Sequence, residues 1–179
     1  MKWHPILKGL LYAFIIAVVI RVFVVDAFSV SGDSMSPTIN DKEYVIINRT
    51  AYLFGQPKRG DIIVTQPRNS YKKIIKRIAG IPGDRLELFG TNVVIKKDRD
   101  DTGKIVESTD FSEMNSYMKQ NSYQEDVKVF TVDPYEYFVL GDNRAVSIDS
   151  RRLGGIDAWS VKGKVVAKFT YKPFKYSNL

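Results

Sequence analysis

A long apolar stretch near the N-terminus dominates the hydrophobic pattern of this chain. Residues 9–20 read GLLYAFIIAVVI without a charge; Arg21 interrupts, and VFVV follows before Asp26. A helix that crosses a bilayer needs roughly 20 apolar residues, with a lower limit of ~17. The seventeen positions between Lys8 and Asp26 reach that limit if the Arg21 side chain extends toward the nearer lipid interface.

The stretch predicts a single transmembrane anchor within residues 1–28. Lys2 and Lys8 precede it, so the positive-inside rule places the N-terminus in the cytoplasm and residues 29–179 outside. A cleavable secretion signal is one alternative, but no small-x-small cleavage site follows the stretch. A buried core helix is another, but a run that is apolar on all faces at the N-terminus favours an anchor.

The rest of the chain alternates short apolar runs with turn residues, a pattern typical of β-strands. The expected strands are 43–48, 61–65, 73–80, 86–88, 93–96, 135–140 and 163–171. Turns are expected at 57–60 and 81–84, and a hairpin around 90–92. Residues 98–128 are polar and poor in strand signals, and we interpret them as a variable insertion with a short helix near 113–119. The pattern predicts a mainly β fold built on antiparallel sheet, following the N-terminal transmembrane helix.

Composition narrows the possible chemistry. The 179 residues include no Cys, which excludes disulfides, a Cys nucleophile and thiolate metal sites. The one His, His4, precedes the apolar stretch, so a zinc site of several imidazoles is excluded, and a Ser-His-Asp triad would require His4 to fold back. We therefore expect no metal and no cofactor. The charges behind the net +7 are interspersed, except for the cluster Lys72, Lys73, Lys76 and Arg77. There is no nucleic-acid-binding motif, which favours a basic surface near lipid over a nucleic-acid partner.

The first segment with candidate chemistry is SGDSMSPT at 31–38. Ser34 follows Gly32 by two residues and precedes Pro37 by three, so its backbone is constrained. Such a turn can direct the hydroxyl outward and leave backbone N–H groups available for an oxyanion. Taken alone, the segment could equally be an ordinary loop after the anchor.

The second segment is KIIKRI at 73–78, in a predicted strand. Ile74, Lys76 and Ile78 share one face because side chains alternate along a strand. Burial would lower the pKa of a lysine, and a neutral amine beside a Ser hydroxyl is a competent general base. Ser-Lys pairs are a known variant of the catalytic triad. The alternative is that Lys76 faces water, as most lysines do.

The third segment follows a predicted apolar strand and combines GDNR at 141–144 with SIDSR at 147–151. Asp, Asn, Arg and Ser at this density predict a loop held by charge-assisted hydrogen bonds. The alternative is a plain turn with surface ion pairs, which contribute little stability.

In this order, the segments resemble the sequence boxes of type I signal peptidases, also called leader peptidases. SMSPT at 34–38 is similar to the serine box, and RGDIIV at 59–64 to the box that follows it. IKRIAGIPGD at 75–84 resembles the lysine box, and GDNRAVSIDSR at 141–151 resembles the last box. The resemblance covers nearly the whole chain except 98–128, and four boxes in order form a specific pattern.

The resemblance implies a serine endopeptidase that removes N-terminal signal peptides from secreted precursor proteins at the outer face of the cytoplasmic membrane. Ser34 would be the nucleophile and Lys76 the base, with an acyl-enzyme as intermediate. Ser147 would orient the lysine amine, and Asp149 and Arg151 would form a supporting salt bridge. Residues 29–179 would then be an extracytoplasmic peptidase domain. The single anchor and small insertion are similar to the compact form of Gram-positive bacteria.

Two further expectations concern the surroundings of the nucleophile. Some relatives use a Ser hydroxyl two residues before the nucleophile as an oxyanion donor; Gly32 stands there, so this side-chain donor is missing. Met35 and Ile75 are candidates to line the shallow pockets for small residues at the first and third positions before the bond. The expected partners are signal-peptide-bearing precursors and the lipid bilayer, with no nucleic acid.

Three other functions compete with this interpretation. A catalytically silent paralogue would have lost the Ser or the Lys, and Ser34 and Lys76 are both present. A self-cleaving repressor relative that uses Ser and Lys would be soluble and cytoplasmic, which the apolar stretch disfavours. A non-enzymatic basic protein of the membrane surface would fail to react with a covalent serine probe.

Overall fold

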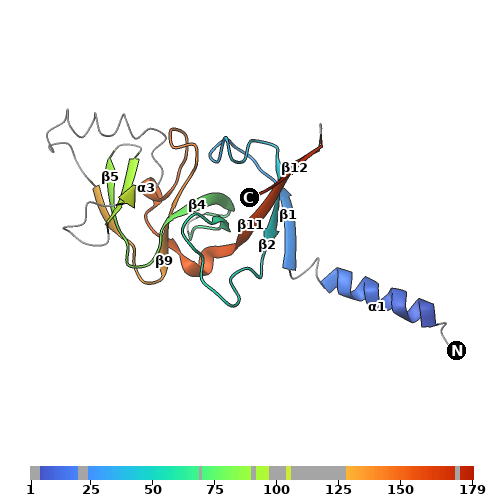
Figure 1. Ribbon diagram of the computed structural model, residues 1–179. Helices are drawn as coiled ribbons and strands as arrows, with labels where there is room; N and C mark the ends of the chain where they lie inside the picture. Colours follow the sequence, from blue (N-terminus) through green and yellow to red (C-terminus); the bar gives the residue numbers. More distant parts are fainter. Residues whose placement is uncertain are drawn as a thin grey trace.

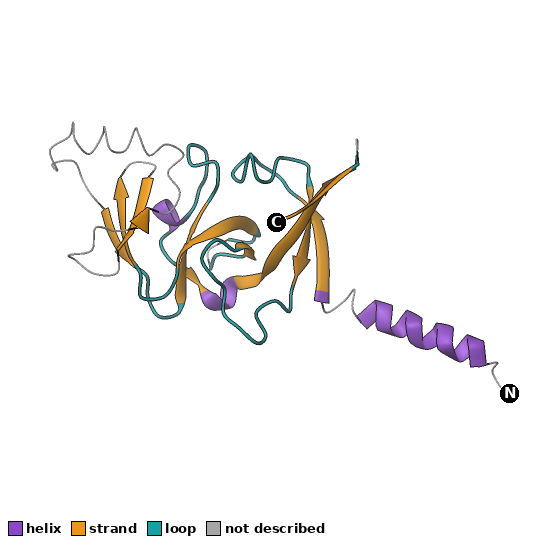
Figure 2. Cartoon of the chain, viewed as in Figure 1, coloured by secondary structure: helices purple, strands orange, loops and turns teal. Residues whose placement is uncertain are grey.

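The protein has a mainly β architecture, as the sequence predicts (Figure 2). The computed structural model describes residues 5–19, 24–68, 70–89, 92–96, 104–105, 128–171 and 174–179. The helix expected near 113–119 lies outside these residues. The two-residue strand β7 (Lys104–Ile105) is described, so the insertion predicted at 98–128 contributes to a sheet.

The larger sheet carries the residues of interest. Its strands are β1 (Val25–Ser29), β2 (Tyr44–Asn48), β3 (Ile62–Thr65), β4 (Ile74–Gly80), β9 (Glu136–Leu140), β10 (Ile156–Asp157), β11 (Val161–Thr170) and β12 (Lys175–Asn178). Their order is β1-β2-β11-β3-β4-β9-β10, with β12 beside β11, and every pairing is antiparallel. In Figure 1, β4 and β9 lie between the β1–β2 side and the end that carries β5.

A smaller sheet lies at that other end, in the order β7-β6-β5-β8. Its longer strands are β5 (Arg85–Phe89), β6 (Asn92–Lys96) and β8 (Lys128–Thr131). Leu86 and Val93 pack in one apolar cluster with Phe138 and Leu140 of β9. The two sheets therefore share buried surface, and β9 belongs to the large sheet while packing against the small one.

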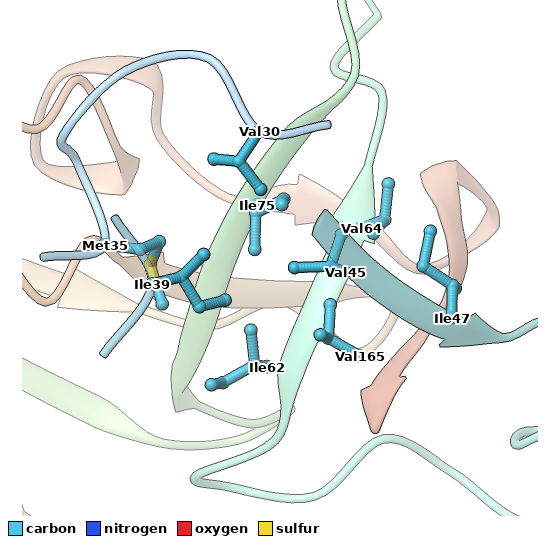
Figure 3. Packing of buried hydrophobic residues seen from close by; sticks show 9 residues of the cluster. All are labelled: Val30, Met35, Ile39, Val45, Ile47, Ile62, Val64, Ile75 and Val165. Carbon is cyan, nitrogen blue, oxygen red and sulfur yellow. The ribbon is translucent and has the colours of Figure 1, made fainter. Parts of the chain in front are cut away.

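A second apolar cluster fills the region around β4. It joins side chains of β2, β3, β4 and β11 to three residues that follow β1, and Figure 3 shows these side chains converging. The three are Val30, Met35 and Ile39. The segment after β1 is therefore fixed against the sheet by apolar burial, the main favourable contribution to folding.

All seven strands expected from the sequence are present, with ends shifted by a few residues. The pattern did not predict β1, β7, β8, β10 and β12. Strand β1 begins at Val25 and pairs with β2, so the last residues of the segment 1–28 form part of the sheet. Asp26 and Ser29 interrupt the apolar pattern, and the preceding valines read as a continuation of the anchor.

Helix α1 (Pro5–Val19) extends away from both sheets (Figure 1). Its apolar side chains are exposed on all sides, including Phe14 at 67%. Within the described residues, no helix combines the length and apolarity required to cross a membrane, and α1 has 15 residues. The transmembrane crossing thus stays a prediction.

Candidate active site

Ser34 and Lys76, 42 residues apart in the chain, meet at the surface of the large sheet. Nζ of Lys76 lies 2.7 Å from Oγ of Ser34. Ser34 lies in the turn after β1, and Lys76 lies within β4, where it is in register with Ile63 of β3. The structure thus brings together the two residues that the sequence singled out, at hydrogen-bonding distance.

Local constraints hold the serine turn, which we define as residues 31–38. Gly32 has φ +105°, a conformation that favours glycine, and its N–H donates to Oδ1 of Asp41 at 2.8 Å. Met35 and Ile39 are fully buried, and the N–H of Ile39 donates to the carbonyl of Met35. Ser34 therefore lies between a turn position that favours glycine and a buried apolar side chain.

Lys76 is buried, with 3% of its surface exposed. Burial lowers the pKa of its ammonium below the ordinary value of 10.5, while the negative charges of Asp149 and Asp142 act in the opposite direction. The alternative that Lys76 faces water is thus wrong for this structure. Lys72 and Lys73, the neighbouring amines, are both exposed.

Asp149 ends the loop 141–149, which we call the aspartate loop, and forms most of its side-chain contacts. Its side chain is fully buried and accepts from Arg151 Nε at 2.9 Å, Arg151 Nη2 at 3.0 Å and the Gly141 N–H at 3.0 Å. Burial alone would raise the pKa of Asp149, but the Arg151 guanidinium and the Gly141 N–H hold it below its usual range. Asp149 also caps the short helix α3 (Ser150–Leu153). The predicted Asp149–Arg151 ion pair is present.

The aspartate loop and the serine turn approach each other closely at Gly141. A Cβ at this position would collide with Oγ of Ser147 and with the carbonyl oxygen of Ser34. Ser147 is buried there, and both its side chain and the Ser34 carbonyl lie close to Gly141. Its expected role of orienting the Lys76 amine stays a prediction.

Two contacts at the site were not predicted from the sequence. The N–H of Asn143 donates to the Ser34 carbonyl at 3.1 Å, and Arg77 forms a two-pronged ion pair with Asp142 at 2.8 and 2.7 Å. Arg77 follows Lys76 directly and Asp142 lies in the last box, but a separation of 65 residues hides their pairing in the sequence. These contacts connect the aspartate loop to the serine turn and to β4.

Met35 and Ile75, expected to line substrate pockets, lie in the same apolar cluster (Figure 3). Met35 is 1% exposed and Ile75 is 8% exposed. Met35 is adjacent in sequence to Ser34 and Ile75 is adjacent to Lys76, so this apolar cluster reaches the candidate site. In the described part of the chain, no group of three His, Cys, Asp or Glu side chains is placed to hold a metal ion.

Comparison with known proteins gives a consistent result. The family model described as signal peptidase, peptidase S26, matches residues 3–170. Signal peptidase I of Bacillus amyloliquefaciens is 34% identical over 170 residues, which covers 93% of this chain and 86% of the relative. Signal peptidase I S of Bacillus subtilis (strain 168) is 33% identical over 171 residues, covering 93% and 88%.

A relative from another genus and a solved structure also match. Signal peptidase IB of Staphylococcus aureus (strain MRSA252) is 30% identical over 177 residues, covering 92% of this chain and 88% of the relative. The crystal structure of a signal peptidase I from Enterococcus faecalis V583 aligns with a TM-score of 0.42 and 30% identity, over 61% of this chain and 96% of that one. Since the family model spans nearly all of the chain and the relatives match over most of their length, this chain belongs to the signal peptidase family, peptidase S26.

Proposed function

We propose that the protein is a serine endopeptidase that removes N-terminal signal peptides from secreted precursors by means of Ser34 and Lys76. The observation that carries the proposal is the 2.7 Å contact between the Ser34 hydroxyl and the buried Lys76 amine. Family membership supports the reaction class, and the relatives that match are named signal peptidases.

The reaction starts with Lys76 neutral. Its amine takes the proton from Oγ of Ser34 as Oγ attacks the scissile carbonyl carbon, forming a tetrahedral oxyanion. The resulting ammonium then protonates the departing amine of the mature protein, the C–N bond breaks, and an acyl-enzyme remains. In the second half, Lys76 takes a proton from water, hydroxide attacks the ester, and Ser34 recovers its proton as the signal peptide leaves.

The electrostatics around Lys76 favour the neutral amine that this mechanism requires. Asp149 and Asp142 attract a proton to Lys76, but each is paired with an arginine: Asp149 with Arg151, and Asp142 with Arg77. Because these ion pairs satisfy the carboxylates, burial is the larger effect and the pKa of Lys76 falls.

Stabilisation of the oxyanion is assigned to the backbone of the serine turn. The proposed donor is the N–H of Ser34, in a segment fixed by the contact between the Asn143 N–H and the Ser34 carbonyl. Gly32 supplies no side-chain oxygen, so the second donor expected in some relatives is missing here.

An open strand edge supports extended binding of the precursor. Strand β3 pairs with β4 from Ile74 to Arg77, whereas β9, on the opposite edge, pairs only from Arg77 to Gly80. In the described part of the chain, the edge from Ile74 to Lys76 is thus left without a strand on the β9 side. The precursor residues before the scissile bond extend along this edge as an added strand, with Met35 and Ile75 below their small side chains.

The exposed apolar helix α1 supports attachment to a bilayer. An apolar surface of this extent marks a contact with lipid or protein. Together with Lys2 and Lys8, it supports a chain anchored through its N-terminal segment, with the N-terminus cytoplasmic and the peptidase domain on the outer face.

Cleavage of a precursor in lipid or detergent tests the proposal. Wild type, Ser34→Ala, Lys76→Ala and Lys73→Ala are compared, with Lys73→Ala as a matched control because Lys73 is exposed. We expect wild type and Lys73→Ala to cut after a small residue, and the other two to lose activity by at least about a hundredfold. Circular dichroism checks that each variant is folded.

Other outcomes would reject specific parts of the proposal. A folded Lys76→Ala that still cuts would place the base elsewhere. A wild type that neither cuts nor reacts at Ser34 with a covalent serine probe would favour a silent paralogue or a non-enzymatic surface protein.

A further inference from the structure

The segment that follows the serine turn makes contacts that the proposed mechanism does not use. Residues 40–43, which we call the brace, form a tight turn in which the N–H of Glu43 donates to the carbonyl of Asn40 at 3.3 Å. Lys42 has φ +65°, a left-handed conformation that favours glycine. Such backbone persists only where the surrounding structure determines it, and it is concentrated at functional sites. The conformation of the brace is therefore set by its contacts.

The backbone of the brace holds the chain just before the serine turn. Val30 donates its N–H to the carbonyl of Glu43 at 2.8 Å, and its own carbonyl accepts from the N–H of Lys42 at 3.0 Å. The Val30 side chain lies in the apolar cluster of the large sheet (Figure 3). Both the backbone and the side chain of Val30 are thus fixed, four residues before Ser34.

Two side chains of the brace contact the serine turn on either side of the nucleophile. Oδ1 of Asp41 accepts from the N–H of Gly32 at 2.8 Å, two residues before Ser34. Oδ1 of Asn40 accepts from the hydroxyl of Ser36 at 2.9 Å, two residues after Ser34. The position of the nucleophile therefore depends on the position of the brace.

Glu43 connects the brace to the large sheet. Its side chain is buried, and Oε2 accepts from the N–H of Asn40 at 2.8 Å and from Nζ of Lys168, in β11, at 3.0 Å. Burial alone would raise the pKa of Glu43, but the Asn40 N–H and the Lys168 ammonium hold it below its usual range. Glu43 is thus a charged carboxylate at neutral pH, and its ion pair with Lys168 fixes the brace on β11.

We infer that Glu43 is a positioning residue for the nucleophile: through the brace, it keeps Oγ of Ser34 within reach of Lys76. The inference rests on the proposed function and adds a residue that touches neither the precursor nor the reacting atoms. A misplacement of about 1 Å can lower the rate of an enzyme by about a hundredfold. The N–H of Asn143 and the buried side chain of Met35 also hold the serine turn, so loss of Glu43 should shift the turn without releasing it.

A second lysine of β11 supplies a matched control. Lys164 pairs with Asp61 at 2.6 Å, and Asp61 lies outside the serine turn and the brace. We compare wild type, Glu43→Ala, Glu43→Gln, Lys168→Met and Lys164→Met. For each, kcat and KM for precursor cleavage in detergent are measured beside the urea midpoint of unfolding.

The expected effects follow from the contacts that each variant removes. Glu43→Ala should lower kcat by about tenfold with little change in KM, because the edge of β4 that binds the precursor is untouched. Lys168→Met should lower kcat by about three- to fivefold, since Glu43 keeps its bond to the Asn40 N–H. Glu43→Gln retains an oxygen that can accept from Asn40, and it should stay within about threefold of wild type. Lys164→Met should lower the urea midpoint but retain the kcat of wild type.

Two further measurements distinguish positioning from a general loss of structure. The rate at which a covalent serine probe labels Ser34 should fall in parallel with kcat in Glu43→Ala. The pH at which kcat/KM is half-maximal should not move, because the negative charges that act on the Lys76 amine are those of Asp149 and Asp142. A displaced midpoint would mean that the variant acts on the base instead of the nucleophile, and would overturn the inference.

The remaining outcomes also decide the matter. A folded Glu43→Ala with the kcat of wild type overturns the inference and leaves the proposed function intact. Equal losses of kcat in Lys168→Met and Lys164→Met overturn it too, because they indicate a general effect of destabilisation. If Glu43→Ala does not fold, the comparison of Lys168→Met with Lys164→Met decides by the same measure. A wild type that neither cuts the precursor nor reacts with the probe rejects the proposed function itself.

Discussion

Helix α1 and strand β4 place their residues in opposite ways. In α1, apolar side chains face outward on every side: Phe14 is 67% exposed and Ile16 is 59% exposed. In β4, a charged residue is inside: Lys76 is 3% exposed and its neighbour Ile78 is fully buried. Helix α1 exposes apolar side chains, which water solvates poorly, and β4 buries a lysine side chain, which water solvates well.

Both arrangements cost free energy in water, so each points to something beyond folding. Exposed apolar area is stabilised only when another apolar surface covers it, which is the reason for proposing a bilayer around α1. A buried amine loses hydration, and its neutral form is favoured as a result. On the proposed function, α1 serves the location of the protein and β4 serves its chemistry.

The pH dependence of cleavage is the most sensitive test of the proposal that Lys76, in β4, acts as the base. The folded-state pKa of Lys76 is lowered, so the neutral amine gains population as pH rises through that value. Below it, kcat/KM should fall by about tenfold per pH unit. A rate that stays flat from neutral to strongly acidic conditions would contradict the assignment of Lys76 as base.

The lowered pKa of the Lys76 amine also makes the free energy of unfolding depend on pH. The unfolded chain binds the Lys76 proton more tightly than the folded chain, so this contribution to the free energy of unfolding rises with pH between the lowered pKa and the ordinary 10.5. Below the lowered pKa, the contribution does not change with pH.

Truncation of one isoleucine in each segment sharpens the comparison. Ile78→Ala should lower the free energy of unfolding by about 2–5 kcal/mol, because it leaves a cavity in the core. Ile16→Ala in α1 should change it by less than about 0.5 kcal/mol, because the side chain is exposed. Urea denaturation in the same detergent measures both. Equal losses would mean that α1 packs on the domain.

Replacement of Lys76 by an apolar residue should separate activity from stability. Lys76→Met should abolish cleavage but raise the free energy of unfolding by about 1 kcal/mol, because active-site residues often trade stability for function. The matched Lys73→Met, at an exposed position, should leave stability within about 0.5 kcal/mol. A large loss of stability in Lys76→Met would show that the amine is needed for the fold.

Much of the fold followed from local sequence patterns. Runs such as YVIIN and YEYFVL have strong strand propensity and clear turn boundaries, and they form β2 and β9. The short strands β10 and β12 lack such runs. They form because β9 and β11 present edges to them, a condition that does not exist in the isolated segment.

The proposed Ser34–Lys76 pair followed from the order of the motifs, but its surroundings did not. Ser34 and Lys76 were identified because four boxes occur in sequence, each with characteristic residues. The Arg77–Asp142 ion pair and the contact from Asn143 to Ser34 depend on the approach of β4 and the aspartate loop. No local pattern encodes that approach.

The amino-acid sequence alone established the residue types, their order and the apolar N-terminal stretch, because each of these can be read from residues that are neighbours in the chain. The packing of the sheets established which face of β4 is buried and how near Asp149 and Asp142 come to Lys76. Alternation along a strand assigns side chains to two faces, but whether a face is covered depends on elements far away in sequence. The burial of Lys76, and with it the lowered pKa of its amine, is therefore a property of the tertiary structure.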